Sequence, residues 1–179
     1  MSTTATGFTV DVPSSLMELL YLRAVWVLPV LSGVPQLAAP PQPPTRQPAP
    51  AIASEWPVAW QEALNQLRDG ALDVLIPSWR QKYGLEGIDD AHLRAWRDNN
   101  RRALTDAYMG SFRDRRSRKR DRATFATAVE CGLRMEYVLM GVESFHTWLS
   151  PHILLIAQST RFSPDDYERV LTDHLQSVS

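Results

Sequence analysis

The stretch ATFATAVECGLRMEYVLMG, residues 123–141, decides the class of fold, because two periodicities fit it equally well. Read at period two, alternate residues share an apolar face; read at a period of 3.6, residues three and four apart do so. Gly132 separates the two readings, since a glycine commonly follows the last turn of a helix. We therefore expect a helix over about 121–131, followed by a strand over 133–140.

Further short strands are expected on both sides of this stretch. HILLIAQS, residues 152–159, is a continuous apolar run of strand length, and we expect it to pair antiparallel with 133–140 across the intervening loop. FTVDV at 8–12 and ALDVLIP at 71–77 alternate apolar and other residues, which favours a short strand in each place.

Helical segments outside this stretch carry the periodicity and the capping residues of helices. The clearest start is SPDDYERV, where a proline at the first helical position and two acidic residues suit the positive end of a helix. The segments are 13–24 with Ser14 or Ser15 as cap, 54–69 with Ser54, 88–110 with Asp89, and 163–175 with Ser163. Together the patterns predict an α+β fold in which about four helices dominate two to four short, mainly antiparallel strands.

Proline divides the chain, because residues 35–57 contain eight of the thirteen prolines. Proline fixes φ and donates no backbone hydrogen bond, so this segment favours extended polyproline II. We expect an N-terminal strand and helix block at 1–34, a Pro-rich linker at 35–54 and an α+β globular domain at 55–179. The block at 1–34 is apolar enough to pack onto the rest of the chain or onto a partner.

Composition favours a folded, cytoplasmic protein. Apolar residues make up 44% of the 179, which is enough to build a core. Cys131 is the only cysteine and cannot form an intramolecular disulfide, which indicates a reducing setting. The most apolar run, 16–31, contains Glu18 and Arg23 and is shorter than the roughly 20 residues of a membrane-spanning helix. We expect no membrane association.

Charge is unevenly distributed, although the net charge is only −1. From Arg94 to Arg122 there are eleven lysines and arginines against four aspartates, a balance of +7, so the remainder carries −8. The run from Arg113 to Arg122 has no apolar residue and cannot be a core-packed helix, although it could be a solvated loop, a protruding helix or a ligand surface. Such separation of charge bears on association rather than on fold.

The candidate binding residues are the arginines and the lysine of this region. Arg94, Arg97 and Arg101 are spaced to share one helix face, and arginine forks suit phosphate and carboxylate groups. The candidates for binding a polyanion or a partner are Arg94, Arg97, Arg101, Arg102, Arg113, Arg115, Arg116, Arg118, Lys119, Arg120 and Arg122. No aromatic residue lies in the run 113–122, which disfavours base stacking, and simple solvation of the charges is the remaining alternative.

Catalytic and metal chemistry have weak support in the sequence. His146 and His152 with Glu143 could ligate a metal, or Cys131 could act as a nucleophile with one of these histidines, but the spacing matches no standard signature. No glycine-rich phosphate loop or Gly-x-Ser-x-Gly elbow is present. We therefore expect no catalytic residues, no metal site and no cofactor.

The sequence resembles no family that we identify and favours a non-catalytic interaction or assembly protein. We expect it to use the apolar N-terminal block on its proline tether, together with the Arg-rich surface, to bind a protein partner or a second copy of itself. The first alternative is a nucleic-acid-binding accessory protein that uses the basic surface at 94–122. The second is an enzyme of unfamiliar type built around residues 131–152.

Overall fold

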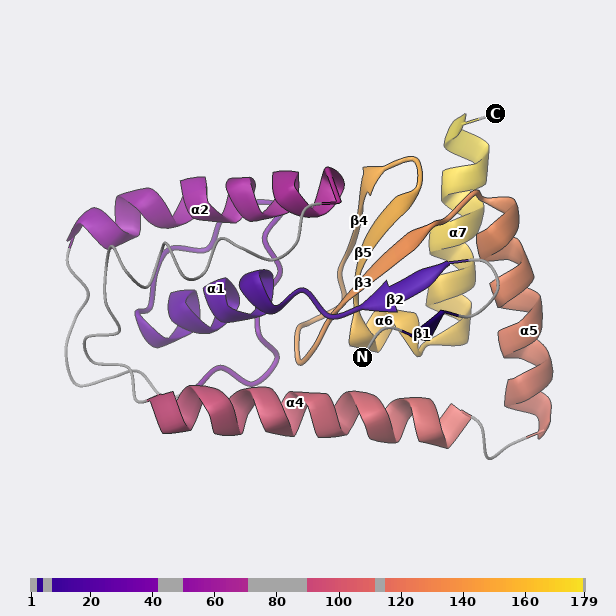
Figure 1. Ribbon diagram of the computed structural model, residues 1–179, viewed down its shortest axis with the longest axis horizontal. Coiled ribbons are helices and arrows are strands. Elements are labelled where there is room, and N and C mark those ends of the chain that lie inside the picture. The colour runs from indigo at the N-terminus through magenta and orange to yellow at the C-terminus, as the bar shows by residue number, and fades with distance from the viewer. Residues whose placement is uncertain (1–2, 5–7, 42–49, 71–89, 112–114, 179) are drawn as a thin grey trace.

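The computed structural model describes residues 3–4, 8–41, 50–70, 90–111 and 115–178. This part of the chain contains six helices and five strands (Figure 1). The strands are β1 (Thr3–Thr4), β2 (Thr9–Asp11), β3 (Met135–Leu139), β4 (His146–Ser150) and β5 (Ile153–Ala157). The helices are α1 (Ser14–Val25), α2 (Pro50–Arg68), α4 (Asp90–Ser111), α5 (Arg115–Glu130), α6 (Gln158–Arg161) and α7 (Pro164–Val178). The predicted α+β class is confirmed.

The strands form one mixed sheet in the order β1-β2-β3-β5-β4. The pairs β1–β2 and β4–β5 are antiparallel, whereas β2–β3 and β3–β5 are parallel. The expectation that the strand at 133–140 pairs antiparallel with 152–159 is therefore wrong. The physical reason is β4, a strand inside the segment expected to be a loop. Because β4 turns back into β5 as a hairpin, β5 enters the sheet beside β3 in the same direction.

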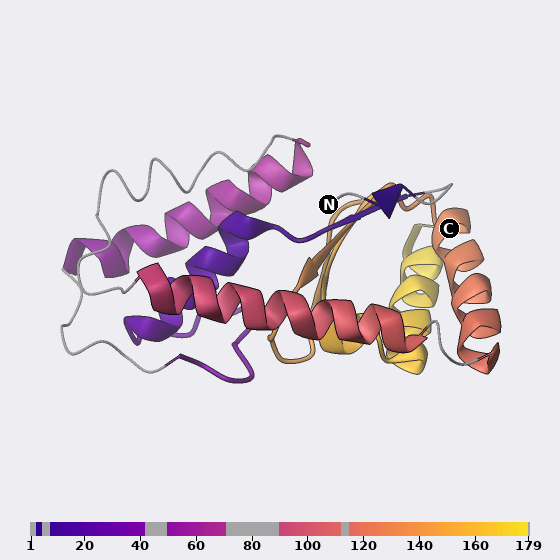
Figure 2. The same ribbon diagram turned by 60° about the horizontal axis from the view of Figure 1, so that its bottom comes forward.

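Side chains of the two central strands alternate between two cores. Tyr137, Leu139 and Leu155 belong to one apolar cluster, while Val138, Leu154 and Ile156 belong to another on the opposite face. A sheet covered on both faces has continuous apolar strands, as in LLIA of β5. The sheet is thus covered by α5 and α7 on one face and by α1 and α2 toward the other, while α4 runs from beside α1 to the ends of α7 and α5 (Figures 1 and 2).

Helix α1 is the central element of the larger cluster, and ten of its twelve residues are buried. It lies between α2 and α4 (Figures 1 and 2). The indole Nε1 of Trp56 in α2 donates a hydrogen bond to the Leu19 carbonyl at 2.9 Å. On the other side, the Tyr21 ring packs against Trp96 of α4 with centroids 5.1 Å apart. The N-terminal segment therefore packs into the same core as the rest of the chain.

Several boundaries differ from the sequence expectation. Helix α1 begins after Pro13 without a side-chain capping hydrogen bond, so neither Ser14 nor Ser15 caps it as predicted. Helix α2 begins at Pro50 rather than near Ser54, and Leu37 of the expected linker forms an antiparallel bridge with Val142. A bridge of this kind needs extended backbone, which the surrounding prolines allow.

The stretch that decided the fold behaves as expected, with one extension. Gly132 has a φ of 73° directly after α5, a conformation that glycine adopts readily, and β3 follows. The helix begins earlier than residue 121, however, because the basic residues from Arg115 form its first two turns. From Arg115 onward, the backbone of the basic run is therefore helical and not a loop.

A buried ion pair ties β3 to the C-terminal helices. The Glu136 carboxylate is fully buried, and its Oε1 lies 2.5 Å from Nε of Arg161 in α6. The Tyr167 hydroxyl of α7 donates a hydrogen bond to Glu136 Oε2 at 3.1 Å. Burial raises the pKa of Tyr167 well above its usual value, and it raises the pKa of Tyr108 of α4, whose hydroxyl is also buried.

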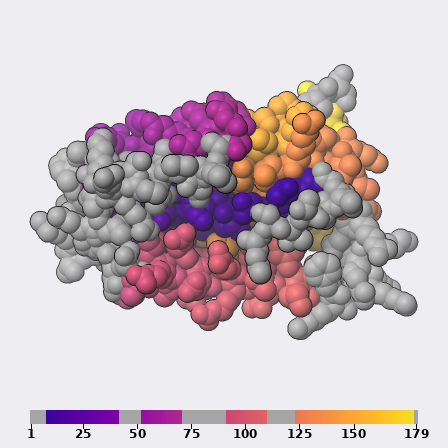
Figure 3. All heavy atoms as spheres, in the orientation of Figure 1, coloured from indigo at the N-terminus to yellow at the C-terminus, as the bar shows by residue number. Residues whose placement is uncertain are grey.

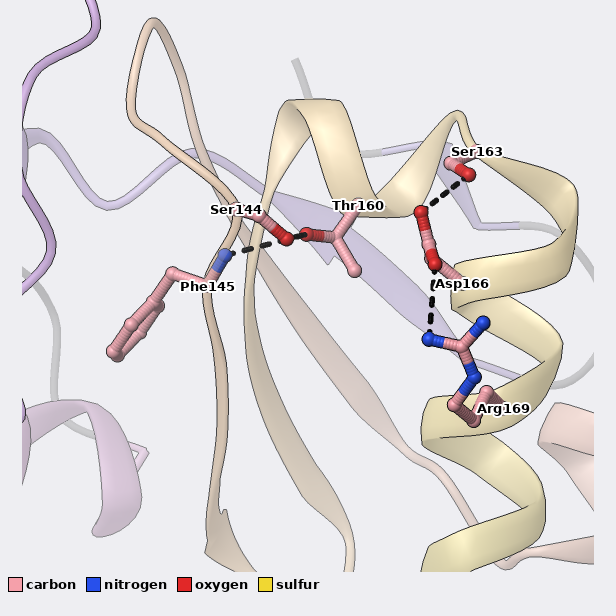
Figure 4. Close-up of polar contacts among 6 residues, drawn as sticks. All are labelled: Ser144, Phe145, Thr160, Ser163, Asp166 and Arg169. Atoms are coloured by element: carbon pink, nitrogen blue, oxygen red, sulfur yellow. Dashed lines mark hydrogen bonds and ion pairs between the residues drawn. The ribbon is translucent and has the colours of Figure 1, made fainter.

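Polar contacts also fix the segment from α6 into α7 (Figure 4). The Thr160 hydroxyl lies 3.1 Å from that of Ser144 and accepts a hydrogen bond from the Phe145 amide, which ties α6 to the loop before β4. At the start of α7, the Ser163 hydroxyl donates to Asp166 Oδ2 at 2.6 Å. Asp166 in turn lies 3.2 Å from Arg169, one turn further along. Helix α7 begins at Pro164, as predicted.

Some expectations lie outside the described residues. These are the strand at 71–77, the Asp89 cap and the part of the Pro-rich segment at 42–49. Within the described ranges, no helix is long and apolar enough to cross a membrane.

Candidate anion-binding groove

Helices α1 and α4 enclose a groove of about 240 Å³ at the place where α1 begins. It is lined by side chains from three separate parts of the chain: Val12, Ser14 and Met17 from the start of α1, Met140 from the end of β3, and Arg94, Arg97, Asp98 and Arg101 from α4. In Figure 3 the N-terminal segment is seen as a band with α4 directly below it. Three of the predicted binding residues thus share one recess.

The α1 side of the groove is the N-terminal end of a buried helix. The first amides of a helix have no partner within it and carry a partial positive charge. Here the first helical hydrogen bond is donated by the Met17 amide to the Pro13 carbonyl, and the first turn contains no acidic residue. The N-cap residue, Pro13, forms no side-chain capping hydrogen bond. The α1 side therefore adds to the positive potential of the groove and does not offset it.

The α4 side supplies the full charges. Arg94 and Arg101 are exposed, whereas Arg97 is half-buried and lies 3.9 Å from the carboxylate of Glu18. Glu18 is itself only 2% exposed, so Arg97 compensates a buried charge and is held in place by it. Asp98 is the one acidic residue among the described lining residues, beside the three arginines.

The floor of the groove is apolar and fixed. The Met140 amide donates to the sulfur of Met17 at 3.3 Å, which joins α1 to the end of β3. Both methionines are buried. Val12 stands half-buried beside them. The groove therefore offers hydrocarbon contact below and charge along its α4 wall.

A close contact between Gly141 and Asn100 sets how near α4 lies to the end of β3. Gly141, next to Met140, has a φ of 62°, and a methyl group added there would overlap the amide oxygen of Asn100 and come within 3.2 Å of its Cγ. Asn100 is fixed in turn, because its Nδ2 donates to the Trp96 carbonyl at 3.0 Å.

The other predicted binding residues lie along the same two helices. Arg102 is exposed on α4 and does not line the groove. Arg113 lies outside the described residues. The remaining candidates occupy helical positions in the first two turns of α5, where the backbone is described and the side chains are not: Arg115, Arg116, Arg118, Lys119, Arg120 and Arg122.

The residues considered for metal or nucleophile chemistry have structural contacts. His152 is exposed, and its Nδ1 lies 2.9 Å from the Gly132 carbonyl. Cys131 is buried with its sulfur 3.5 Å from the Leu171 carbonyl, and burial raises the pKa of its thiol, which disfavours the reactive thiolate. In the described part of the chain, no three side chains of the metal-binding types come together.

The chain has no match among known protein families, and no curated protein or solved structure shows significant similarity to it. The groove's own chemistry is therefore the basis for any functional argument. Helical spacing in the sequence groups the three arginines of the groove, whereas its other lining residues were not predicted: Val12, Ser14, Met17 and Met140. These come from segments that only the tertiary fold brings together, and no local pattern marks them.

Proposed function

We propose that this protein is a non-catalytic binding protein that recognises an acidic protein partner through the arginine face of α4, defined as Arg94, Arg97, Arg101 and Arg102. The observation that carries the proposal is the groove, because it places three of these arginines beside the uncapped start of α1. Arginine clusters at helix N-termini favour carboxylate and phosphate groups through charge-assisted hydrogen bonds.

The exposed surface of α4 suits a protein better than a nucleic acid. Asp98 and Asp106 are exposed among its arginines, and both would repel a continuous row of phosphates. Met109 is 53% exposed on the same helix. Arginine and methionine are enriched in protein interfaces, and a pattern of mixed charge gives specificity for a partner of complementary pattern.

The apolar N-terminal segment has a different part in this proposal from the one expected of a tethered block. Its helix α1 and strand β2 are occupied within the protein's own core. Its contribution to binding is the start of α1, which forms one wall of the groove. The single cysteine, buried as a thiol, supports a cytoplasmic location for this activity.

The test is binding of a fluorescein-labelled, glutamate-rich peptide, measured by anisotropy at low and at moderate salt. We expect saturable binding that weakens as salt screens the charges. Replacing Arg94, Arg101 and Arg102 together with serine should weaken it about tenfold, from about 0.5 kcal/mol for each exposed charge. The matched control replaces Arg134 and Arg169, which are exposed elsewhere, and should leave affinity unchanged.

Two results would overturn the proposal. Equal loss of affinity in the α4 variant and in the Arg134 and Arg169 control would show that binding depends on overall charge and not on the arginine face. Tighter binding of duplex DNA of equal net charge, lost in the α4 variant, would replace the protein partner by a nucleic acid. The acidic partner could be a second copy of this chain, because the residues outside 94–122 carry a net negative charge. Light scattering of the protein alone tests this, since a dimer in the absence of peptide would identify the second copy as the partner.

A further inference from the structure

The first two turns of α5, residues 115–122, form a second basic segment that the proposed function does not use. Their backbone is helical, and the helix continues to Glu130. Figures 1 and 2 both show α5 as the outermost element at one end of the molecule. Six of the eight residues are basic: Arg115, Arg116, Arg118, Lys119, Arg120 and Arg122.

The two residues of this segment that are not basic share a helix stripe with two buried residues. Further along α5, Thr124 and Ala128 are buried, and Ala128 belongs to the apolar cluster between α5, α7 and the sheet. Ser117 and Asp121 precede them at helical spacing, so all four positions lie on one stripe. At about 100° per residue, the six basic positions occupy an arc about 200° wide, centred opposite that stripe.

The charge pattern of this helix start is unfavourable for the protein on its own. The positive end of a helix favours acidic residues, yet the first turn of α5 contains none and begins with Arg115 and Arg116. Like charges one turn apart, such as Arg116 and Arg120, also destabilise a helix. A bound polyanion offsets both effects. Because such breaches of local rules are expected at functional sites, the pattern points to an anionic ligand.

We propose that the start of α5 binds the phosphate backbone of double-stranded DNA, with residues 115–122 in the major groove. This surface is separate from the arginine face of α4, so the inference goes beyond the proposed function. The major groove is about 12 Å wide and admits an α-helix. A basic arc of about 200° reaches the phosphates on both walls of such a groove, whereas a flat acidic protein surface contacts one side of a helix only.

The position of the acidic residues favours rows of phosphates over an acidic protein. On α4, Asp98 and Asp106 are exposed among the arginines. In the first two turns of α5 the one acidic residue, Asp121, lies on the stripe of buried residues, which leaves the basic arc uninterrupted. The run 113–122 also lacks aromatic residues, and single strands are held largely by stacking on aromatic rings. The segment therefore suits a duplex, bound without preference for base sequence.

The formal charge sets the expected dependence on salt. Residues 115–122 carry +5, or +3 if Asp165 and Asp166 in the first turn of the neighbouring α7 are counted against them. Each neutralised phosphate contributes about −0.9 to the slope of log K against log salt concentration. We therefore expect a slope of about −3 to −4 for duplex DNA.

The experiment titrates a fluorescein-labelled duplex of about 20 base pairs with the full chain, between about 50 and 200 mM salt, and follows anisotropy. Arg116→Gln with Arg120→Gln, the α5 variant, should flatten the slope by about two and weaken binding about fiftyfold at about 0.1 M salt. Glutamine is as good a helix former as arginine, so circular dichroism should be unchanged. The matched control, Arg134→Gln with Arg169→Gln, also removes two charges and should leave the slope unchanged.

Four results would overturn the inference. The first is no saturable binding of the duplex at about 50 mM salt. The second is equal loss of affinity in the α5 variant and the control, which would show that overall charge governs binding. The third is tighter binding of a glutamate-rich peptide than of a duplex of equal charge, lost in the α5 variant, which would assign the segment to an acidic protein. The fourth is tighter binding of a single strand of the same length, which would reject the major groove.

Crossing the variants and the ligands separates this inference from the proposed function. Duplex binding that is lost in the α5 variant and retained in the α4 variant, without binding of the glutamate-rich peptide, keeps the DNA surface and rejects the proposed function. Peptide binding that is lost in the α4 variant, without binding of the duplex, does the reverse.

Discussion

Replacing Gly141 with alanine should destabilise the protein through the contact that sets α4 against the end of β3. Gly141 has a φ of 62°, and its Cα faces the side chain of Asn100. An added methyl group meets two separate penalties. One is the left-handed backbone, and the other is overlap with an amide that is hydrogen bonded to the Trp96 carbonyl and cannot rotate away without losing that bond.

The magnitudes of the two penalties can be separated. A left-handed conformation costs an alanine about 1–2 kcal/mol, and overpacking costs about 1–3 kcal/mol. Gly141→Ala should therefore lower the free energy of unfolding by about 2–5 kcal/mol in total. Gly70 is the matched control, because it has a φ of 71° and none of the described residues has an atom within 4 Å of an added methyl group. Gly70→Ala should cost only the conformational part, about 1–2 kcal/mol.

The assay is urea unfolding followed by tryptophan fluorescence, with the m-values compared to ensure a common unfolding transition. The double variant Gly141→Ala with Asn100→Ala removes the overlap and should recover the steric part, which gives a coupling energy of about 1 kcal/mol or more. Equal destabilisation by Gly141→Ala and Gly70→Ala would refute the close approach of α4. So would the absence of coupling between positions 100 and 141.

Two further predictions concern the buried ion pair. Arg161→Met should lower the free energy of unfolding by about 3–5 kcal/mol, because it leaves the Glu136 carboxylate buried without its partner. The control Arg169→Met, at an exposed ion pair, should lower it by less than about 1 kcal/mol. Equal stability of the two variants in urea unfolding would contradict this prediction. Burial raises the pKa values of Tyr108 and Tyr167, so the stability that they contribute is complete below the unfolded value of about 10 and is lost as pH rises toward their folded values. In an alkaline titration, absorbance at 295 nm should show that these two tyrosines ionise only when the far-UV circular dichroism signal is lost. Ionisation of all tyrosines while that signal is unchanged would contradict the prediction.

The sequence predicted local structure well where a single signal was strong. Gly132 correctly separated α5 from β3, and Pro164 correctly marked the start of α7. The direction of pairing between β3 and β5 was mispredicted because the edge strand β4, HTWLS, has no continuous apolar run to mark it as a strand. Local periodicity carries no information about which strand enters the sheet between two others.

The candidate site was predictable on one side only. Helical spacing brought Arg94, Arg97 and Arg101 together, because residues on one helix face need no tertiary information. The opposite wall depends on α1 packing between two helices and on the absence of a side-chain cap at Pro13, although two serines follow it. Those serines predicted a capped helix start, whereas the fold leaves that start facing the arginines.

The most direct test of the arginine face is the location of binding. In ¹H–¹⁵N correlation spectra of the full chain titrated with the glutamate-rich peptide, amides of residues 14–17 and 94–102 should shift first and in a saturable way. Shifts centred on α7 or on the opposite face of the sheet, or a uniform response that follows ionic strength alone, would contradict the account.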